Sequence, residues 1–283
     1  MKRVLPFLLL LTLLIPMTAW ADMGPKPSVN VAFRGLEDET YYVTLLSETD
    51  STGPWSHSQE YRDYYGDQAV FEAFNGYEDP DGFYFIGCYE DCSADHTFSW
   101  TYYPPQVFKV LVYFPETETF AVTEDTYERY AFDSYFKVNA GSAPETGLLA
   151  PLHKDYPYGQ EALSLAARIL LTLAAEVALA FVFGYRAKEQ LKVIFFVNLV
   201  TQVVLNLALN LINYNSGSMA FTFHYVWMEA AVFALEGLVF AATLKKWDKK
   251  PDRKAHPWVY SLTANGTSFI LGLFLAHQIP GIF

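Results

Sequence analysis

The chain has 283 residues, of which 52% are hydrophobic and 18% are charged, a balance that excludes a disordered protein. Its formal net charge is −12, but the charge is unevenly divided. Residues 22–158 hold 24 acidic and 7 basic side chains, whereas residues 159–283 hold 7 acidic and 10 basic ones. So acidic a first half excludes nucleic acid as a partner, because nucleic-acid affinity comes largely from neutralised phosphates.

The first 21 residues have the three parts of a secretory signal peptide. Residues 1–3 are Met-Lys-Arg, residues 4–16 are apolar, and residues 19–21 are Ala-Trp-Ala, a small-x-small cleavage site. An uncleaved anchor is the alternative, but the apolar stretch is short for a helix that crosses a bilayer. We therefore expect residues 1–21 to be cleaved off, so that the chain from Asp22 onward begins outside the cytoplasm.

Residues 22–145 predict an acidic, aromatic-rich β-sandwich domain on the extracytoplasmic side. Short β-branched and aromatic runs alternate there with Gly, Pro, Asp and Ser clusters, which is typical of strands and turns. The expected strands cover residues 28–34, 40–46, 82–88, 97–102, 107–114, 119–123 and 131–138. Residues 37–39 are expected at a hairpin tip between the first two strands, and residues 146–160 as a linker.

Three features of this domain bear on function. Residues 51–75 form a connection too long for a hairpin loop, which could carry a binding surface for an unknown ligand or protein. Residues 79–82, Asp-Pro-Asp-Gly, resemble the start of a calcium loop, but the following residues do not continue that pattern, so a plain turn is favoured. Cys88 and Cys92 are the only cysteines, and in an exported chain such a pair predicts a disulfide rather than a metal site.

After Gly159 the composition changes, and a second domain is predicted over residues 161–283 as an all-α bundle of four transmembrane helices. Its four apolar stretches cover about 164–184, 191–212, 221–243 and 258–279. Each is close to the roughly 20 residues that a helix needs to cross the hydrocarbon core of a bilayer. The chain is thus expected to be a multi-pass protein of the cell membrane, with the lipid bilayer as its first partner.

The charges of the loops predict how the helices are oriented. Loops 185–192 and 245–257 are basic, which places them in the cytoplasm, whereas residues 213–219 are uncharged. The N-terminal domain and the C-terminus then both lie outside. Aromatic residues near the expected helix ends are typical of the belts at membrane surfaces. They are Tyr185, Tyr214, Trp247, Trp258 and Tyr260.

Each predicted helix carries polar residues along one side. Counted from the cytoplasmic loops, one residue of each helix lies at the same depth, about 10–12 Å inside the membrane at 1.5 Å per residue. These four are Glu176, Asn198, Glu236 and Asn265, and Thr201, Gln202 and Ser268 lie within about one turn of them. We predict that the seven form an intramembrane polar site. Nearer the outer face, Arg168 and Glu229 are predicted to form an ion pair, because each is costly alone in a membrane.

The chemistry of the predicted polar site leaves several alternatives. The oxygens of Glu176, Glu236, Asn198 and Asn265 are ligands that suit a divalent or monovalent cation, and the two carboxyl groups could instead share a proton. The amides alone are better explained as hydrogen-bonding contacts between helices.

Three functions remain for the whole chain. The first is binding of a cation or protons, coupled to binding of a ligand or protein by the extracytoplasmic domain. If the protein is a transporter, we expect it to form a homo-oligomer or to act with a membrane partner. The second is a sensor or scaffold whose helices are only an anchor. The third is an intramembrane enzyme that uses Glu176 and Glu236 as acid and base. The third is the least favoured, because the motifs expected of an intramembrane hydrolase or of a nucleotide-binding enzyme are missing from the sequence. We therefore expect the protein not to be an enzyme.

Overall fold

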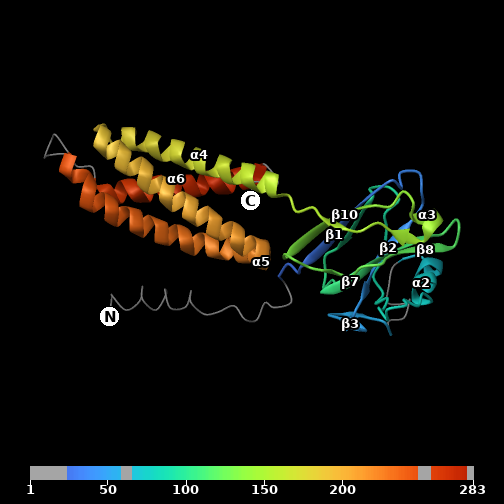
Figure 1. Cartoon of the computed structure of the whole chain (residues 1–283). Coiled ribbons are helices and arrows are strands. Elements are labelled where there is room, and N and C mark those ends of the chain that lie inside the picture. The colour runs from blue at the N-terminus through green and yellow to red at the C-terminus, as the bar shows by residue number, and fades with distance from the viewer. Residues whose placement is uncertain (1–23, 59–65, 248–255, 279–283) are drawn as a thin grey trace, which may run out of the picture.

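The computed structural model describes residues 24–58, 66–247 and 256–278. Figure 1 shows a β-rich region beside a group of long helices, which meet at one end of the helices. The predicted signal peptide, most of the second basic loop and the C-terminal residues 279–283 lie outside the described residues, so the expectations about them stay predictions.

The β-rich region is built on two main sheets and a small hairpin. Its strands are β1 (Ser28–Arg34), β2 (Tyr42–Ser47), β3 (Ser51–Thr52), β4 (Trp55–Ser56), β5 (Glu90–Asp91), β6 (Thr97–Trp100), β7 (Val107–Phe114), β8 (Thr119–Thr123), β9 (Tyr127–Glu128), β10 (Asp133–Asn139), β11 (Leu148–Leu149) and β12 (His153–Lys154). The first sheet has the order β12-β10-β1-β6, with β1 and β10 parallel. The second has the order β11-β8-β7-β2-β5, with β9 also paired to β7, and β3 pairs with β4.

One apolar core joins the two main sheets. Val29, Val31 and Phe33 alternate along β1, so that they lie on one face of their sheet, and all three are buried. They belong to the same cluster as Val110 and Val112 of β7 in the other sheet. The expected β-rich first region is therefore present, and β1 and β7 have the predicted bounds.

A helix covers the opposite face of the second sheet. This helix, α2 (Gln68–Asn75), begins at Asp67, whose carboxylate accepts hydrogen bonds from the backbone N–H groups of Ala69 and Val70. Its buried residues Phe71 and Phe74 pack in a second cluster with residues of β2 and β7. The long connection over residues 51–75 therefore contains the β3–β4 hairpin and a packed helix, and only residues 59–65 of it are not described.

Three sequence expectations about this region were wrong. Residues 37–39 form a turn, but not a hairpin tip, because β1 and β2 lie in different sheets. Residues 82–88 form no strand and make only one isolated bridge, between Tyr84 and Ser47. Residues 146–160 are not simply a linker, since β11 pairs with β8 and β12 pairs with β10. A short helix, α3 (Ala143–Thr146), precedes β11.

The predicted disulfide is also absent, because Cys88 and Cys92 are both free. Thr44 Oγ1 donates to the carbonyl oxygen of Cys88 (2.6 Å), and Cys92 N donates to that of Tyr41 (3.1 Å). The segment between the cysteines thus runs along β2 and includes β5. Four residues of extended chain cover about 13 Å, whereas a disulfide requires Cα atoms within about 7 Å. Burial raises the pKa of both thiols, which makes them poor nucleophiles.

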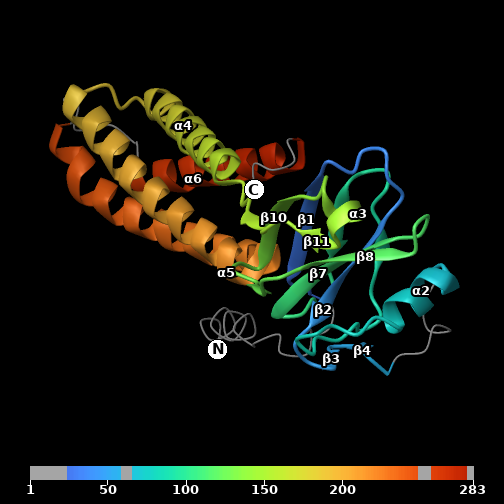
Figure 2. The same ribbon diagram turned by 45° about the vertical axis from the view of Figure 1, so that its right-hand side comes forward.

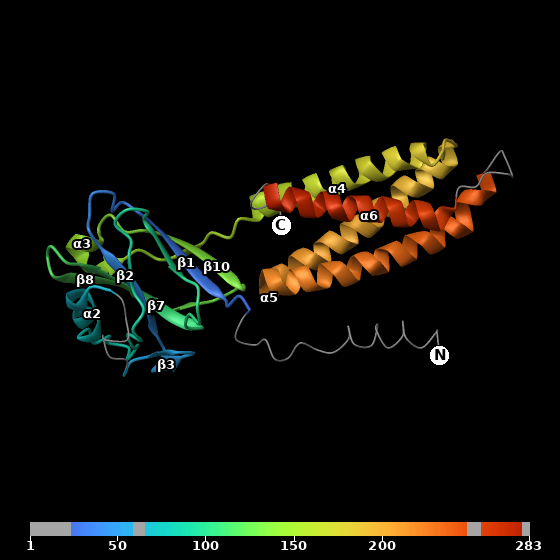
Figure 3. The ribbon, with the colours of Figure 1, turned by 180° about the vertical axis from the view of Figure 1, so that it is seen from behind.

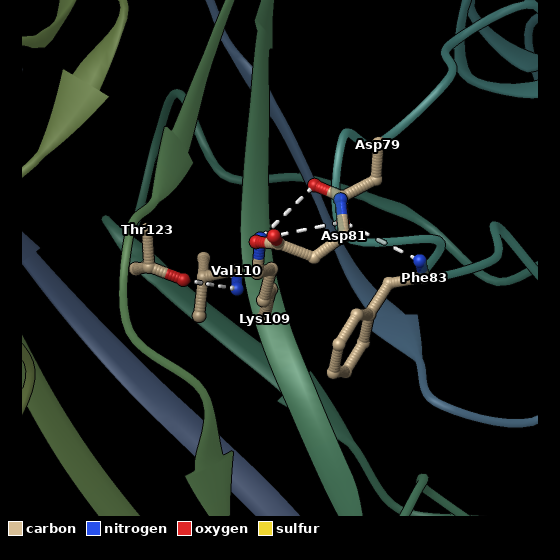
Figure 4. Close-up of polar contacts among 6 residues, drawn as sticks. All are labelled: Asp79, Asp81, Phe83, Lys109, Val110 and Thr123. Carbon is tan, nitrogen blue, oxygen red and sulfur yellow. Dashed lines mark hydrogen bonds and ion pairs between the residues drawn. The ribbon is translucent and has the colours of Figure 1, made fainter.

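The turn at residues 79–82 is held by a buried lysine. Figure 4 shows Lys109 of β7 beside the carboxylates of Asp79 and Asp81, with Nζ 3.2 Å from Asp79 Oδ1. Asp79 Oδ2 also accepts hydrogen bonds from the backbone N–H groups of Asp81 (3.1 Å) and Phe83 (3.3 Å). The two carboxylates therefore pair with Lys109, and that of Asp79 also caps the turn. This agrees with the prediction that residues 79–82 form a plain turn.

The helical region contains α4 (Tyr158–Val182), α5 (Lys188–Thr243), the short 3-10 helix η3 (Leu244–Trp247) and α6 (Pro257–Gln278). Gly217, with φ 79° and ψ 177°, interrupts α5. Gln190 Nε2 donates to the carbonyl oxygen of Leu244 (3.0 Å), and Thr201 Oγ1 donates to Glu236 Oε1 (2.6 Å). Contacts between residues so far apart in the sequence require the chain to double back, and Gly217 is where the helix is interrupted. Figure 2 shows α5 folded into two arms.

The reversal divides α5 into a first arm, residues 188–216, and a second arm, residues 218–243. The uncharged loop expected over residues 213–219 is thus a break of a single residue. Figure 3 shows α4, the two arms and α6 side by side.

Two helices of the described chain are long and apolar enough to cross a membrane. They are α4 and the continuous segment of α5 and η3, Lys188–Trp247. The 25 residues of α4 extend about 37 Å at 1.5 Å per residue, which exceeds the thickness of a hydrocarbon core, about 30 Å. Leu163, Leu170 and Val182 on α4 are each more than 60% exposed, as expected of side chains that face lipid. These features support membrane association.

Candidate functional site

Glu236, on the second arm of α5, is fully buried and is held by two donors from other segments. Its Oε1 accepts a hydrogen bond from Thr201 Oγ1 of the first arm (2.6 Å), and its Oε2 accepts one from Asn265 Nδ2 of α6 (2.6 Å). Hydrogen bonds to an ionised carboxylate are among the strongest that proteins form. Glu236 therefore joins three of the helical segments.

Glu176 brings α4 into the same cluster. Its side chain is fully buried, and Oε1 accepts a hydrogen bond from Ser268 Oγ of α6 (3.3 Å). The carboxyl group is close enough to that of Glu236 for the two to interact electrostatically. Glu176, Thr201, Glu236, Asn265 and Ser268, which the sequence placed near one depth, are thus brought together. We call these five residues the inner cluster.

Tyr260 is a member of the site that the sequence analysis missed. The expected place of Tyr260 and Tyr185 is an aromatic belt at the membrane surface, but both side chains are almost completely buried. The hydroxyl of Tyr260 donates to the backbone carbonyl of Glu176 (3.0 Å) and lies beside the side chain of Asn198. At about 100° per residue, Tyr260 lies about 80° around α6 from Ser268. Because Tyr260 lies close to the polar side of α6, the helical periodicity of the sequence could have identified it as a neighbour of the polar residues.

Several buried oxygens around the inner cluster have no hydrogen-bond donor among the described residues. They are Glu176 Oε2, Asn198 Oδ1 and Asn265 Oδ1. Asn198 and Glu176 are fully buried, and Asn265 is 5% exposed. Because nearly all buried polar atoms in proteins have a partner, three such oxygens on residues expected to share one site call for a ligand or a water molecule.

A second polar group lies along the same helices, nearer to the β-rich region. Arg168, Glu229, Gln202 and Asn206 line a cavity of about 20 Å³, together with Ser268. Because one water molecule needs about 10–15 Å³, the cavity has room for a water or a small ion but not for an organic substrate. Ser268 contacts both the cavity and Glu176, and so connects this cavity to the inner cluster.

The partners of the residues that line the cavity differ in part from those expected. Gln202, predicted as a member of the intramembrane polar site, accepts hydrogen bonds from Asn206 Nδ2 at its backbone oxygen (2.8 Å) and its side-chain oxygen (3.3 Å). Arg168 Nη2 donates to Asn210 Oδ1 (2.9 Å). Glu229 shares a side-chain hydrogen bond with Tyr225. Arg168 and Glu229 thus face one cavity, and the ion pair between them stays a prediction.

The donor set limits which ion the inner cluster could hold. It offers carboxylate, amide and hydroxyl oxygens, which suit hard cations rather than the metals that prefer histidine or cysteine. Among the described residues, no group of three or more His, Cys, Asp or Glu is arranged to hold a metal ion. Any cation bound between Glu176 and Glu236 would therefore need amide or hydroxyl oxygens, or water, to complete its coordination.

Comparison with protein-family models, with curated proteins and with solved structures found no match. The chemistry of the site is therefore the basis for the proposed function.

Proposed function

We propose that the chain is an integral membrane protein of the cell envelope that binds a cation or protons at the inner cluster. In this proposal α4, the two arms of α5 and α6 form a four-helix transmembrane bundle, and the β-rich region is an extracytoplasmic domain with a sandwich architecture. The observation that carries the proposal is the pair of fully buried carboxyl groups, Glu176 and Glu236, contributed by different helices.

Packing alone is a poor explanation for this pair. An ionised side chain at the middle of a bilayer costs at least about 2.5 kcal/mol on insertion scales, and a second carboxylate nearby adds repulsion. Uncharged residues would connect the helices at a lower cost. A bound cation, or a proton shared by the two groups, removes the repulsion and gives the carboxyl groups a role.

The geometry also supports access to the pair. The cavity lined by Arg168 and Glu229 lies next to Ser268, and Ser268 donates to Glu176. An ion or proton that enters the cavity would meet a hydroxyl group and then the carboxyl pair. This arrangement favours binding or transfer of a small ion over turnover of an organic substrate.

The test is the thermal stability of the full chain in detergent, measured with Na⁺, K⁺, Mg²⁺, Ca²⁺ or Mn²⁺ at two pH values, one mildly acidic and one mildly basic. A cation that binds only the folded protein at a hundredfold excess over its Kd stabilises it by about 2.7 kcal/mol, so the melting temperature should rise. Glu176→Gln and Glu236→Gln should each abolish that rise. Glu189→Gln, at an exposed position near the start of α5, is the control that should keep it.

The two forms of the proposal give different results. If protons are the ligand, no metal ion raises the melting temperature, and the two Gln variants lose the difference between the two pH values that the parent protein and Glu189→Gln show. If the Gln variants respond to every ion and to pH as the parent protein does, the inner cluster only connects helices and the proposal fails.

A further inference from the structure

A second pocket lies where the β-rich region meets the reversal of α5, apart from the inner cluster. It has a volume of about 240 Å³, far more than the roughly 10–15 Å³ that one water requires. Its walls come from three parts of the β-rich region, Pro27, Gln106 and residues 129–132, and from Asn215 of α5. Figure 3 shows the reversal of α5, where its two arms meet, beside the ends of β1 and β10 at this junction.

Hydrogen bonds fix the walls of this pocket. Arg129 N donates to the carbonyl oxygen of Gln106 (3.0 Å), and Gln106 Nε2 donates back to that of Arg129 (3.2 Å). Phe132 N donates to the carbonyl oxygen of Tyr214, beside Asn215 (2.8 Å). The pocket is therefore formed jointly by both regions of the chain before any ligand arrives.

Arg129 is the only charged residue that lines this pocket. The Nε atom of Arg129 is buried and has no hydrogen-bond acceptor among the described residues. None of the salt bridges between described residues involves its guanidinium group. Burial lowers the pKa of Arg129, as expected for a charged group that is partly removed from water. Arg129 as a whole is half-buried, but a buried N–H donor without an acceptor is costly, and a ligand that supplies an anionic acceptor would remove that cost.

Further positive charge gathers at the same place. Lys154 Nζ lies 4.6 Å from the ring centre of Tyr130, which lines the pocket, whereas Lys26 Nζ lies over the ring of Tyr103 (5.0 Å), which does not. Asp155, the acid next to Lys154, is paired with Lys137 instead (2.7 Å). Arg129 and Lys154 therefore bring two of the seven basic residues between positions 22 and 158 to this pocket, where Glu128 and Asp133 flank the lining segment.

We infer that this pocket binds a phosphate group, with the guanidinium of Arg129 as its main contact. A guanidinium presents a planar set of N–H donors that matches phosphate oxygens, and an Arg–phosphate pair is stronger than neutral hydrogen bonds. The phosphate could belong to a lipid headgroup or be free in solution. The lipid source rests on the proposed topology, in which the reversal of α5 lies at the outer membrane surface, whereas the free source does not.

The experiment compares three variants of the full chain in a neutral detergent. Arg129→Gln removes the charge, Arg129→Lys keeps the charge without the planar donors, and Arg34→Gln removes an exposed charge elsewhere in the same region. Melting temperature is measured against inorganic phosphate and against micelles containing phosphatidylglycerol or phosphatidylcholine. Circular dichroism establishes that each variant is folded.

We expect phosphate-bearing ligands to stabilise the parent protein and Arg34→Gln. Arg129→Gln should weaken apparent binding about tenfold to a hundredfold, with a smaller loss for Arg129→Lys. Stabilisation by the lipids but not by inorganic phosphate identifies a headgroup, and stabilisation by inorganic phosphate identifies a free ligand. If no ligand distinguishes Arg129→Gln from Arg34→Gln, or none stabilises the parent protein, the inference is overturned. Neither result depends on Glu176 or Glu236.

Discussion

Lys109 is the residue whose charge is most tightly held in the β-rich region. Its side chain is 3% exposed, and that of its partner Asp79 is fully buried. Burial alone would lower the pKa of Lys109, but hydrogen bonds to Asp81 and Asp79 outweigh it and raise that pKa. The ion pair therefore stabilises the fold below the ordinary lysine pKa of about 10.4, and the stabilisation is lost as the pH rises through the raised value.

We predict that Lys109→Met lowers the free energy of unfolding by about 3–5 kcal/mol, because Asp79 is left as a buried charge without its partner. Denaturant titration followed by tryptophan fluorescence measures the loss. Lys137→Met is the matched control, since its pair with Asp155 is exposed and should contribute about 0–1 kcal/mol. Adding Asp79→Asn to Lys109→Met should restore part of the loss, and equal effects of the two Met variants would contradict the prediction.

The position of an individual residue could be predicted from the sequence where a physical rule restricts where that residue type can lie. Polar residues are costly in lipid, so their depth on each helix could be counted, and Thr201, Glu236 and Asn265 do meet. The same rule could not find Tyr260, because a tyrosine near a helix end is equally compatible with a membrane surface and with a buried contact. Gln202, which follows Thr201 in the sequence, points about 100° away from it around the helix and lines the neighbouring cavity.

Gly217 is the position on which the arrangement of α5 depends. Its φ of 79° with ψ of 177° is essentially restricted to glycine, and a Cβ atom there would lie 2.4 Å from the ring of Phe132. The same residue therefore reverses the helix and receives a side chain of the β-rich region. Tyr214 adds to this junction by contacting the rings of Tyr130 and Tyr156.

We predict that Gly217→Ala destabilises the protein by at least about 1–3 kcal/mol, the cost of holding a residue with a side chain in that conformation. The melting temperature of the full chain in detergent measures it. Gly266→Ala on α6 is the control, because a Cβ atom there meets nothing within 4 Å and alanine favours a helix. Adding Phe132→Ala to Gly217→Ala should relieve the clash but not the backbone strain. A stability of Gly217→Ala equal to that of Gly266→Ala would refute the assignment of the reversal.

Elements were predicted best where the pattern of the sequence is local. Runs of β-branched and aromatic residues predicted the bounds of β1, β7 and β8. Which sheet a strand joins is not local, so the turn at residues 37–39 was mistaken for a hairpin tip. The cysteines were misjudged for a similar reason, because pairing with β2 extends the segment between them, and nothing in that short segment specifies its partner.

For the molecule as a whole, the junction at Gly217 and the basic residues after the second arm of α5 lie at opposite ends of one helix. That arm has 26 residues and extends about 39 Å, more than a hydrocarbon core of about 30 Å. If it spans the membrane, the β-rich region and Lys246 must lie on opposite sides. The positive-inside rule then places Lys246 in the cytoplasm.

We therefore predict opposite labelling of two single-cysteine variants by a membrane-impermeant maleimide. Glu116→Cys, exposed in the β-rich region, should react in intact cells, whereas Lys246→Cys should react only after the membrane is permeabilised. The unmodified chain is the blank, because burial and raised pKa values keep Cys88 and Cys92 slow to react. Labelling of Lys246→Cys in intact cells would reverse the orientation, and equal labelling of both variants from one side would show that the second arm does not cross the membrane.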